Sequence, residues 1–302
     1  MSRAWMAEPE RGSALLMRLI AWIARRLGRR VARLLLFPIS VYFLTCTSKA
    51  RAASRAYLAR VLCRPVRLRD SFHHFYWFAC TVLDRVFLLS GRFEEFDIRM
   101  YGVEALTDQL DRGRGCILLG SHLGSFEVLR ALGLQRDLPI NVLMYEDNAS
   151  KTNAVFKALN PAAAATVIPI GQPQSLLAVQ ERLQRGELVG LLGDRLASDD
   201  KATQCRFLGE RAAFPTGPML LASLLKAPVV LCFGLYRGGR RYDLHFELLA
   251  ETVDIARTER ESALHQWTQR YAERLEHHCR QAPYNWFNFY DFWAAASSNA
   301  AH

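Results

Sequence analysis

The sequence predicts an α/β fold preceded by a basic helical segment, and two observations support this prediction. From about residue 98 onward, short apolar runs alternate with helical patterns, which is typical of a mixed sheet flanked by helices. Residues 1–70 contain fifteen Lys and Arg against three acidic residues, whereas the remaining 232 residues carry a net charge of about −2. The formal net charge of +10 therefore belongs to the front of the chain.

The composition is that of one large globular domain, or of a domain with a small appendage. The 302 residues are 51% hydrophobic and 23% charged, which excludes a disordered chain, collagen and a bare coiled coil. The seven cysteines are an odd number, are widely spaced and form no CxxC pair. We expect them to be reduced, mostly buried thiols in a reducing compartment.

The first predicted element is an amphipathic helix over residues 14–36. At 100° per residue one side is apolar, formed by Leu16, Ile20, Ile23, Leu27, Val31 and Leu34. The opposite side is basic, formed by Arg18, Arg25, Arg29 and Arg33. This pattern predicts a helix in a membrane interface, with its arginines among anionic headgroups. The alternatives are a helix that packs on the domain with an arginine-rich solvent face, and a helix that binds nucleic acid.

An uncharged run over residues 34–48 follows directly, and it contains Pro38. At fifteen residues it is shorter than the roughly 18–20 that a spanning helix needs, so we expect membrane attachment without a defined span. Glu8, Glu10 and the interrupting arginines argue against a cleaved secretory signal.

The remaining chain divides into helices and then the α/β region. We expect membrane-associating helices over residues 1–96, an α/β domain over 97–293 and a flexible tail over 294–302. The candidate strands are residues 116–119, 140–145, 166–169, 188–192, 229–236 and 244–248. Between the third and fourth of these, we expect Ser175 to cap a helix that Gly186 closes.

The residues most suggestive of chemistry lie just after the first candidate strand. An apolar strand runs into a Gly-flanked turn, so His122 is presented at the carboxyl end of a strand. With a bend at Gly124, the Glu127 carboxylate can accept the Nδ1 proton of His122 and leave Nε2 as a base. Such a pair suits a reaction in which the hydroxyl or amine of the substrate attacks an acyl group. A purely structural histidine is the alternative.

Together with later segments, these residues resemble the lysophospholipid acyltransferase superfamily, and most closely its branch of late lipid A acyltransferases. The resemblance covers about residues 30–290. The family signature of His, four spacers and an acid is matched by His122 and Glu127. A second block, a strand ending in an acid, is matched at residues 189–195, where Asp194 takes the position of the acid.

Two further blocks follow in the family order. Residues 207–218 are similar to its Phe-Phe-Gly segment and Pro-Thr-Gly turn, and residues 226–233 to its closing apolar block. The ending at residues 283–293 is similar to relatives found with aryl polyene pigment clusters. The acceptor implied by the resemblance is therefore lipid A, a polyene lipid carrier or another glycolipid. The aromatic ending either lines a lipid-facing groove or covers the edge of the sheet.

The resemblance implies a glycerolipid-acyltransferase-like fold on the cytoplasmic face of the inner membrane. The implied activity is acyl transfer from an acyl carrier protein (ACP) thioester to a hydroxyl or amine of a lipid or glycolipid. His122 would be the general base, assisted by Glu127. Coenzyme A is an alternative donor. Because a carrier protein is acidic, the surplus arginines are candidates to dock it.

Acyl transfer passes through an oxyanion, which requires hydrogen-bond donors. The backbone amides of Gly124 and Ser125 are the nearest in sequence, and the Arg195 side chain is a further candidate. Alternatively, Asp194 and Arg195 form a structural ion pair.

Several other classes of site are missing from the sequence. It has no P-loop, no dinucleotide fingerprint and no GxSxG elbow, and no cofactor is implied. We expect His73, His74, His277 and His278 to be structural and no metal to be bound. The rival functions are a non-catalytic lipid-binding or scaffolding member of the same fold, a nucleic-acid-associated protein and a hydrolase.

Overall fold

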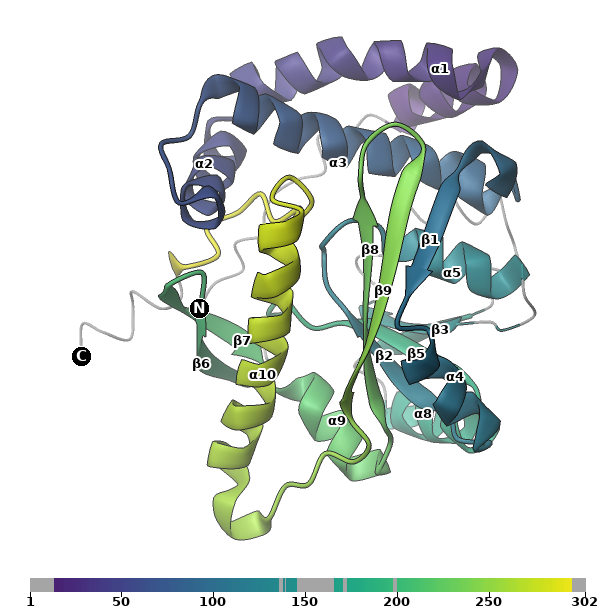
Figure 1. Cartoon of the computed structure of the whole chain (residues 1–302), viewed down its shortest axis with the longest axis vertical. Helices are drawn as coiled ribbons and strands as arrows, with labels where there is room; N and C mark the ends of the chain where they lie inside the picture. Colours follow the sequence, from purple (N-terminus) through teal and green to yellow (C-terminus); the bar gives the residue numbers. More distant parts are fainter. Residues whose placement is uncertain are drawn as a thin grey trace.

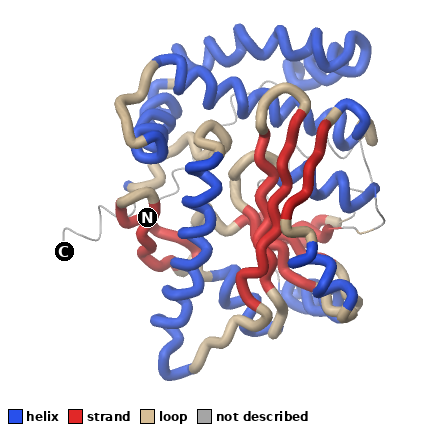
Figure 2. Tube along the Cα trace, viewed as in Figure 1, coloured by secondary structure: helices blue, strands red, loops and turns tan. Residues whose placement is uncertain are grey.

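A seven-stranded sheet lies between two layers of helices (Figures 1 and 2). The computed structural model describes residues 14–135, 138, 140–145, 166–170, 173–197 and 200–294. The sheet order is β1-β9-β8-β2-β5-β3-β4, and a separate two-stranded hairpin is formed by β6 and β7. Strands β8, β2, β5, β3 and β4 are parallel to one another, whereas β9 is antiparallel to β8 and β1 is parallel to β9. The predicted mixed α/β fold is confirmed.

The six predicted strands are all present, with ends that differ by at most a few residues. The strands are β1 (Asp97–Tyr101), β2 (Cys116–Gly120), β3 (Ile140–Tyr145), β4 (Val167–Ile170), β5 (Leu188–Leu192), β6 (Ala202–Phe207), β7 (Glu210–Pro215), β8 (Val229–Tyr236) and β9 (Arg241–Ala250). Strands β1, β6 and β7 were not predicted from the sequence. β1 is an edge strand and has no fully buried residue, and β6 and β7 carry exposed charged residues, so none of them gives a continuous apolar run.

The helices divide between the two faces of the sheet. They are α1 (Ala14–Cys46), α2 (Ser48–Leu62), α3 (Leu68–Leu89), α4 (Glu104–Asp111), α5 (Phe126–Gln135), α8 (Pro173–Gln184), α9 (Gly217–Leu225) and α10 (Arg260–Gln281). The buried side chains of α2, α8, α9 and α10 share a core with one face, and those of α1, α3, α4 and α5 share a core with the other. Successive β2 residues alternate between these cores, as expected for a strand buried on both sides.

One predicted helix start was wrong. Helix α8 begins at Pro173, so Ser175 lies in its first turn, where the hydroxyl bonds to the carbonyl of Pro169. Proline fixes its own φ and is favoured at the first helical position, which explains the earlier start. The predicted end is confirmed, because the helix stops at Gln184 and Gly186 follows with φ of 76°.

Helix α1 is two helical segments joined at a kink. Gly28 has φ of 82° and ψ of 169°, so a helical projection cannot be carried through it. Beyond the kink, Arg29 is only 7% exposed and forms a bidentate ion pair with the fully buried Asp84, at 2.7 and 2.8 Å. The expectation that Arg29 lies among headgroups was therefore wrong, because the kink turns this arginine onto the body of the protein.

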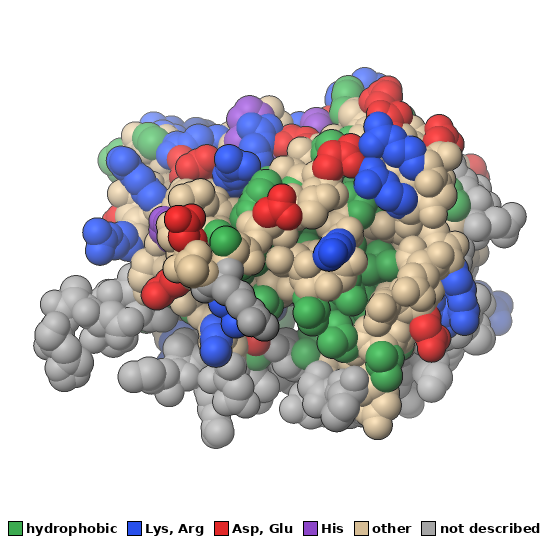
Figure 3. All heavy atoms as spheres, turned by 90° about the horizontal axis from the view of Figure 1, so that it is seen from below, with side chains coloured by type: hydrophobic (Ala, Val, Ile, Leu, Met, Phe, Trp, Pro, Cys, Tyr) green, Lys and Arg blue, Asp and Glu red, His purple; other side chains and the backbone are tan. Residues whose placement is uncertain are grey.

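The exposed side of α1 is mostly apolar, although Arg26 and Arg30 also lie on it. Its large hydrophobic members, which form the apolar stripe of α1, are Trp22, Leu27, Val31, Leu34, Phe37, Val41 and Tyr42, between 38% and 73% exposed. The opposite end of the molecule, seen in Figure 3, instead shows Lys and Arg interspersed with Asp and Glu around a group of hydrophobic side chains. In the described part of the chain, no single helix is long and apolar enough to cross a membrane. By length and composition alone, residues 26–46 and α2 meet that test together as a pair bent by 95°.

Candidate active site

The fold brings His122 and Asp194 together at the carboxyl ends of two neighbouring parallel strands. β2 and β5 pair with Gly120 opposite Leu192, so the residues two positions further on are also opposite each other. His122 thus lies at the strand end where the sequence predicts it. Asp194 reaches it from 72 residues away in the chain.

Asp194 holds the imidazole by one of its ring nitrogens. Nδ1 of His122 lies 2.8 Å from Oδ1 of Asp194, and the backbone N–H of His122 donates to both carboxylate oxygens at 3.0 and 3.1 Å. A carboxylate in this position fixes the tautomer with the proton on Nδ1, which leaves Nε2 as a proton acceptor. The His122 side chain is 27% exposed.

The Asp194 carboxylate is fully buried, and four donor groups surround it. Besides the two from His122, Nε1 of Trp286 donates at 2.9 Å and Nδ2 of Asn288 at 3.0 Å. Burial alone raises the pKa of this carboxyl, but the attraction and hydrogen bonds of His122 outweigh it and lower the pKa to about 2. Burial, reinforced by repulsion from Arg195, lowers the pKa of His122 below its ordinary value of 6.5, despite the attraction of Asp194.

Glu127 does not occupy the position that the sequence analysis gave it. It lies in the first turn of α5, with its carboxylate directed along the helix, where Oε2 is 3.8 Å from Nη1 of Arg130. The left-handed turn at Gly124, with φ of 71°, leads into α5, whose first turn contains Glu127. The Nδ1 acceptor in this structure is therefore Asp194.

The amides of Gly124 and Ser125 are already bonded within the protein. Gly124 N–H donates to the carbonyl of Asn285 and Ser125 N–H to that of Gly234, both at 2.8 Å. These two amides were the candidate donors to an oxyanion. In this structure their hydrogen bonds instead connect the turn to the C-terminal segment and to β8. A Cβ at Gly124 would lie 1.9 Å from the Gly234 oxygen, so a glycine is required there for close packing.

Two arginines contribute positive charge near the imidazole. Arg195 donates from Nε to Oδ1 of Asn288 at 2.7 Å and from Nη2 to the Phe287 carbonyl at 3.0 Å. The neighbouring Asp194 is bonded to His122. Arg85 of α3 was missed by the sequence analysis. Its Nε is buried without a hydrogen-bond partner in the described part of the chain, and its charge contributes to lowering the pKa of His122.

The role of the C-terminal aromatic segment did not follow from the sequence. Phe287 N–H donates to the His122 carbonyl at 2.9 Å, and Trp286 forms an isolated antiparallel bridge with Leu123. This segment therefore crosses the His122 turn and supplies two donors to Asp194. The signal in the sequence was the density of aromatic residues and asparagines at residues 284–293 without any Lys or Arg.

Comparison with known proteins assigns a family to this arrangement. The family model of bacterial lipid A biosynthesis acyltransferases matches residues 6–294. The chain belongs to this family. No curated protein sequence matches the chain. The resemblance to the lipid A branch is thus confirmed, whereas the aryl polyene resemblance of residues 283–293 stays a prediction.

Two of the histidines that we expect to be structural, His74 and His278, are bonded inside the protein. His74 is fully buried between Oγ of Ser54 at 2.9 Å and the Trp286 carbonyl at 2.8 Å, and burial lowers its pKa to about 4. Nε2 of His278 lies 2.7 Å from Oε1 of Glu247. Within the described ranges, no three His, Cys, Asp or Glu side chains are grouped to hold a metal ion.

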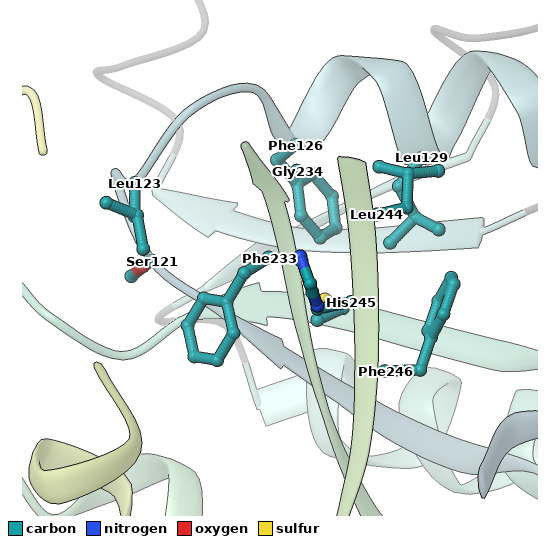
Figure 4. A pocket seen from close by; sticks show the side chains of 10 residues that line it. Ser121, Leu123, Phe126, Leu129, Phe233, Gly234, Leu244, His245 and Phe246 are labelled. Carbon is teal, nitrogen blue, oxygen red and sulfur yellow. The ribbon is translucent and has the colours of Figure 1, made fainter. Parts of the chain in front are cut away.

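A small cavity lies beside the His122 turn, between α5 and the β8–β9 pair (Figure 4). Its lining is mostly apolar and includes Leu123, Phe126 and Phe246. The volume of about 10 Å³ accommodates roughly one water molecule, which is far too small for an acyl chain. The acyl chain therefore does not occupy this cavity in the conformation described.

Proposed function

We propose that this chain is a membrane-associated acyltransferase that moves an acyl group from an acyl-ACP thioester to a hydroxyl or amine of a lipid or glycolipid. The observation that carries the proposal is the partly exposed imidazole of His122, which a buried carboxylate holds through Nδ1 at the carboxyl edge of the sheet. This is the arrangement of a general base, and family membership supplies the acyl-transfer chemistry.

The proposed reaction has two steps. Nε2 of His122 removes the proton of the acceptor as its oxygen or nitrogen attacks the thioester carbonyl. The resulting oxyanion is stabilised by nearby positive charge, for which Arg195 is the candidate. Collapse of this intermediate breaks the carbon–sulfur bond, and the leaving thiolate takes the proton back from the imidazolium. Asp194 stays ionised throughout, which its low pKa supports.

The membrane component of the proposal rests on where α1 lies. Arg29 and Arg33 bond to the Gly239 carbonyl at the β8–β9 turn, beyond the carboxyl end of β8. Since β8 is parallel to β2, α1 is at the same end of the sheet as His122. Its apolar stripe would enter the acyl boundary, while exposed Arg26, Arg30 and further basic residues at the start of α2 would meet anionic headgroups.

This placement fits an enzyme that meets a lipid acceptor at the membrane surface. A soluble, acidic acyl carrier protein would approach from the aqueous side, which on the proposed inner membrane is the cytoplasm. Coenzyme A thioesters are the alternative donor, to be compared in the same assay.

A reconstituted transfer assay tests the proposal. The full-length protein is incubated with acyl-ACP and vesicles prepared from lipid extracts, and acylated lipid is measured by mass spectrometry. His122→Ala should abolish transfer while leaving vesicle binding and the circular dichroism spectrum unchanged. His265→Ala, which removes an exposed histidine bonded to Thr203, is the matched control and should retain full activity.

The outcomes separate the rival functions. Vesicle binding without transfer from any acyl donor would indicate a non-catalytic lipid-binding member of the fold. Release of free fatty acid without an acylated product would indicate a hydrolase. Near-normal transfer by His122→Ala would contradict the assignment of the base.

A further inference from the structure

The C-terminal segment over residues 285–288 contacts both charged residues that follow β5. We propose that Trp286 and Asn288 are positioning residues: they fix the rotation and charge of the Asp194 carboxylate, and Asn288 holds Asp194 and Arg195 at a set separation. The kinetic part of this inference rests on the proposed function, whereas its structural part concerns the tautomer and pKa of His122 alone.

The two carboxylate oxygens of Asp194 have different partners. Trp286 Nε1 and Asn288 Nδ2 both donate to Oδ2, at 2.9 and 3.0 Å. Oδ1 is thereby left for Nδ1 of His122 at 2.8 Å. Because Asp194 is fully buried, water cannot readily replace a lost donor, so each of these bonds matters more than it would at the surface.

Trp286 is itself held rigidly. It is fully buried, and its ring packs against Tyr57 at 5.0 Å and Phe292 at 4.7 Å between ring centroids. Its carbonyl accepts a hydrogen bond from Nε2 of His74 at 2.8 Å. An indole fixed from several sides can hold a carboxylate in one rotation, which a mobile side chain cannot.

Asn288 connects the acid to the cation. Its amide donates from Nδ2 to Asp194 and accepts at Oδ1 from Nε of Arg195 at 2.7 Å, and the side chain is 1% exposed. These two partners determine which way the amide is oriented, since Asp194 requires a donor and Arg195 an acceptor. A single side chain thus bonds both the carboxylate behind the base and the candidate oxyanion cation.

A packing role is the competing explanation, and the chain supplies a matched control for it. Trp293 belongs to the same aromatic cluster and is 7% exposed, but its buried Nε1 has no hydrogen-bond partner in the described part of the chain. Trp286→Phe and Trp293→Phe therefore remove the same number of ring atoms from one cluster. Only the first removes a hydrogen bond to Asp194.

The experiment combines kinetics with nuclear magnetic resonance of ¹⁵N-histidine-labelled full-length protein, in which the His122 signals are identified with His122→Gln. Removing a donor from Oδ2 makes the Asp194 carboxylate more basic, so it stabilises the imidazolium more strongly. In Trp286→Phe and in Asn288→Leu we expect the pKa of His122 to rise and kcat to fall about 10-fold or more at unchanged KM, as is common when a supporting hydrogen bond is lost. Trp293→Phe should leave the pKa and kcat close to those of the wild type.

Equal behaviour of Trp286→Phe and Trp293→Phe, or a loss confined to KM, would overturn the inference. If Trp286→Phe fails to fold by circular dichroism, Asn288→Leu alone decides between the two outcomes. The resonance measurement needs no turnover. If the wild type shows no acyl transfer but Trp286→Phe shifts the pKa of His122, the proposed function fails and the positioning role stands. If the wild type transfers acyl groups but Trp286→Phe leaves the pKa of His122 unchanged, the positioning role fails and the proposed function stands.

Discussion

Replacing Asp194 by asparagine is the most informative perturbation of the proposed base. The substitution keeps the size of the side chain but exchanges one acceptor oxygen for a donor NH₂ group. If the NH₂ group takes the place of Oδ2, it faces N–H groups of Trp286 and Asn288. If it takes the place of Oδ1, it faces Nδ1 of His122, which can give up its proton, while the amide oxygen in the place of Oδ2 still accepts from Trp286, Asn288 and the His122 backbone N–H.

The second orientation is the less costly one, and it inactivates the base. With NH₂ facing Nδ1, the ring proton moves to Nε2, so the nitrogen that must accept the proton of the acceptor already carries one. Each donor–donor contact in the first orientation costs about 1–3 kcal/mol, which disfavours that orientation. The same tautomer error lowers kcat by about 10⁴ in a Ser-His-Asp protease, so we expect a loss on the order of 10³- to 10⁴-fold for Asp194→Asn.

The assay is steady-state transfer from acyl-ACP to vesicle lipid, with Glu127→Gln measured beside it. Since Asp194 is the carboxylate bonded to Nδ1, whereas Glu127 lies beside Arg130, Glu127→Gln should lower kcat much less than Asp194→Asn. An Asp194→Asn variant with near-normal kcat, or a Glu127→Gln variant with the larger loss, would refute the reasoning and return the role of Nδ1 acceptor to Glu127.

Three further predictions follow from charge and exposure. Arg29→Met should lower the free energy of unfolding by about 3–5 kcal/mol in a denaturant titration, because it leaves a buried carboxylate without its cation. Leu34→Glu, at a 73% exposed position of the α1 stripe, should weaken binding to anionic vesicles, whereas Leu224→Glu, 62% exposed on α9, should not. The neutral imidazole of His122 is the active form, and its pKa is lowered, so the acid limb of the kcat/KM profile should lie below pH 6.5. Arg85→Met removes a cation that lowers the pKa of His122, so in this variant the acid limb should move to higher pH.

Much of the fold was predictable because its central strands are buried on both faces. Such strands appear in the sequence as uninterrupted apolar runs, as β2, β5 and β8 do. Edge strand β1 has alternating partial exposure, and the hairpin of β6 and β7 lies outside the main sheet, so neither has that signal. The orientation of α1 depends on a single positive φ at Gly28, which a periodicity argument across residues 14–36 cannot include.

The site was predictable only as far as local sequence reaches. His122 at a strand end follows from the strand, the glycines and the helix start, all within a few residues. The identity of its partner depends on which strands are neighbours, since the β2–β5 register places Asp194 opposite His122. Trp286 and Asn288 come from still further along the chain, and no local pattern links them to the histidine.

The central claim is that His122 is the base of an acyl transfer to a membrane lipid. The measurement that tests it most directly is mass spectrometry of lipids from cells that express the wild-type chain or the His122→Ala variant at equal levels. The account predicts one lipid class that carries an added acyl mass only with the wild-type chain, and that mass identifies both the acyl group and its acceptor. The same acylated lipid in equal amount from both cells would contradict the account.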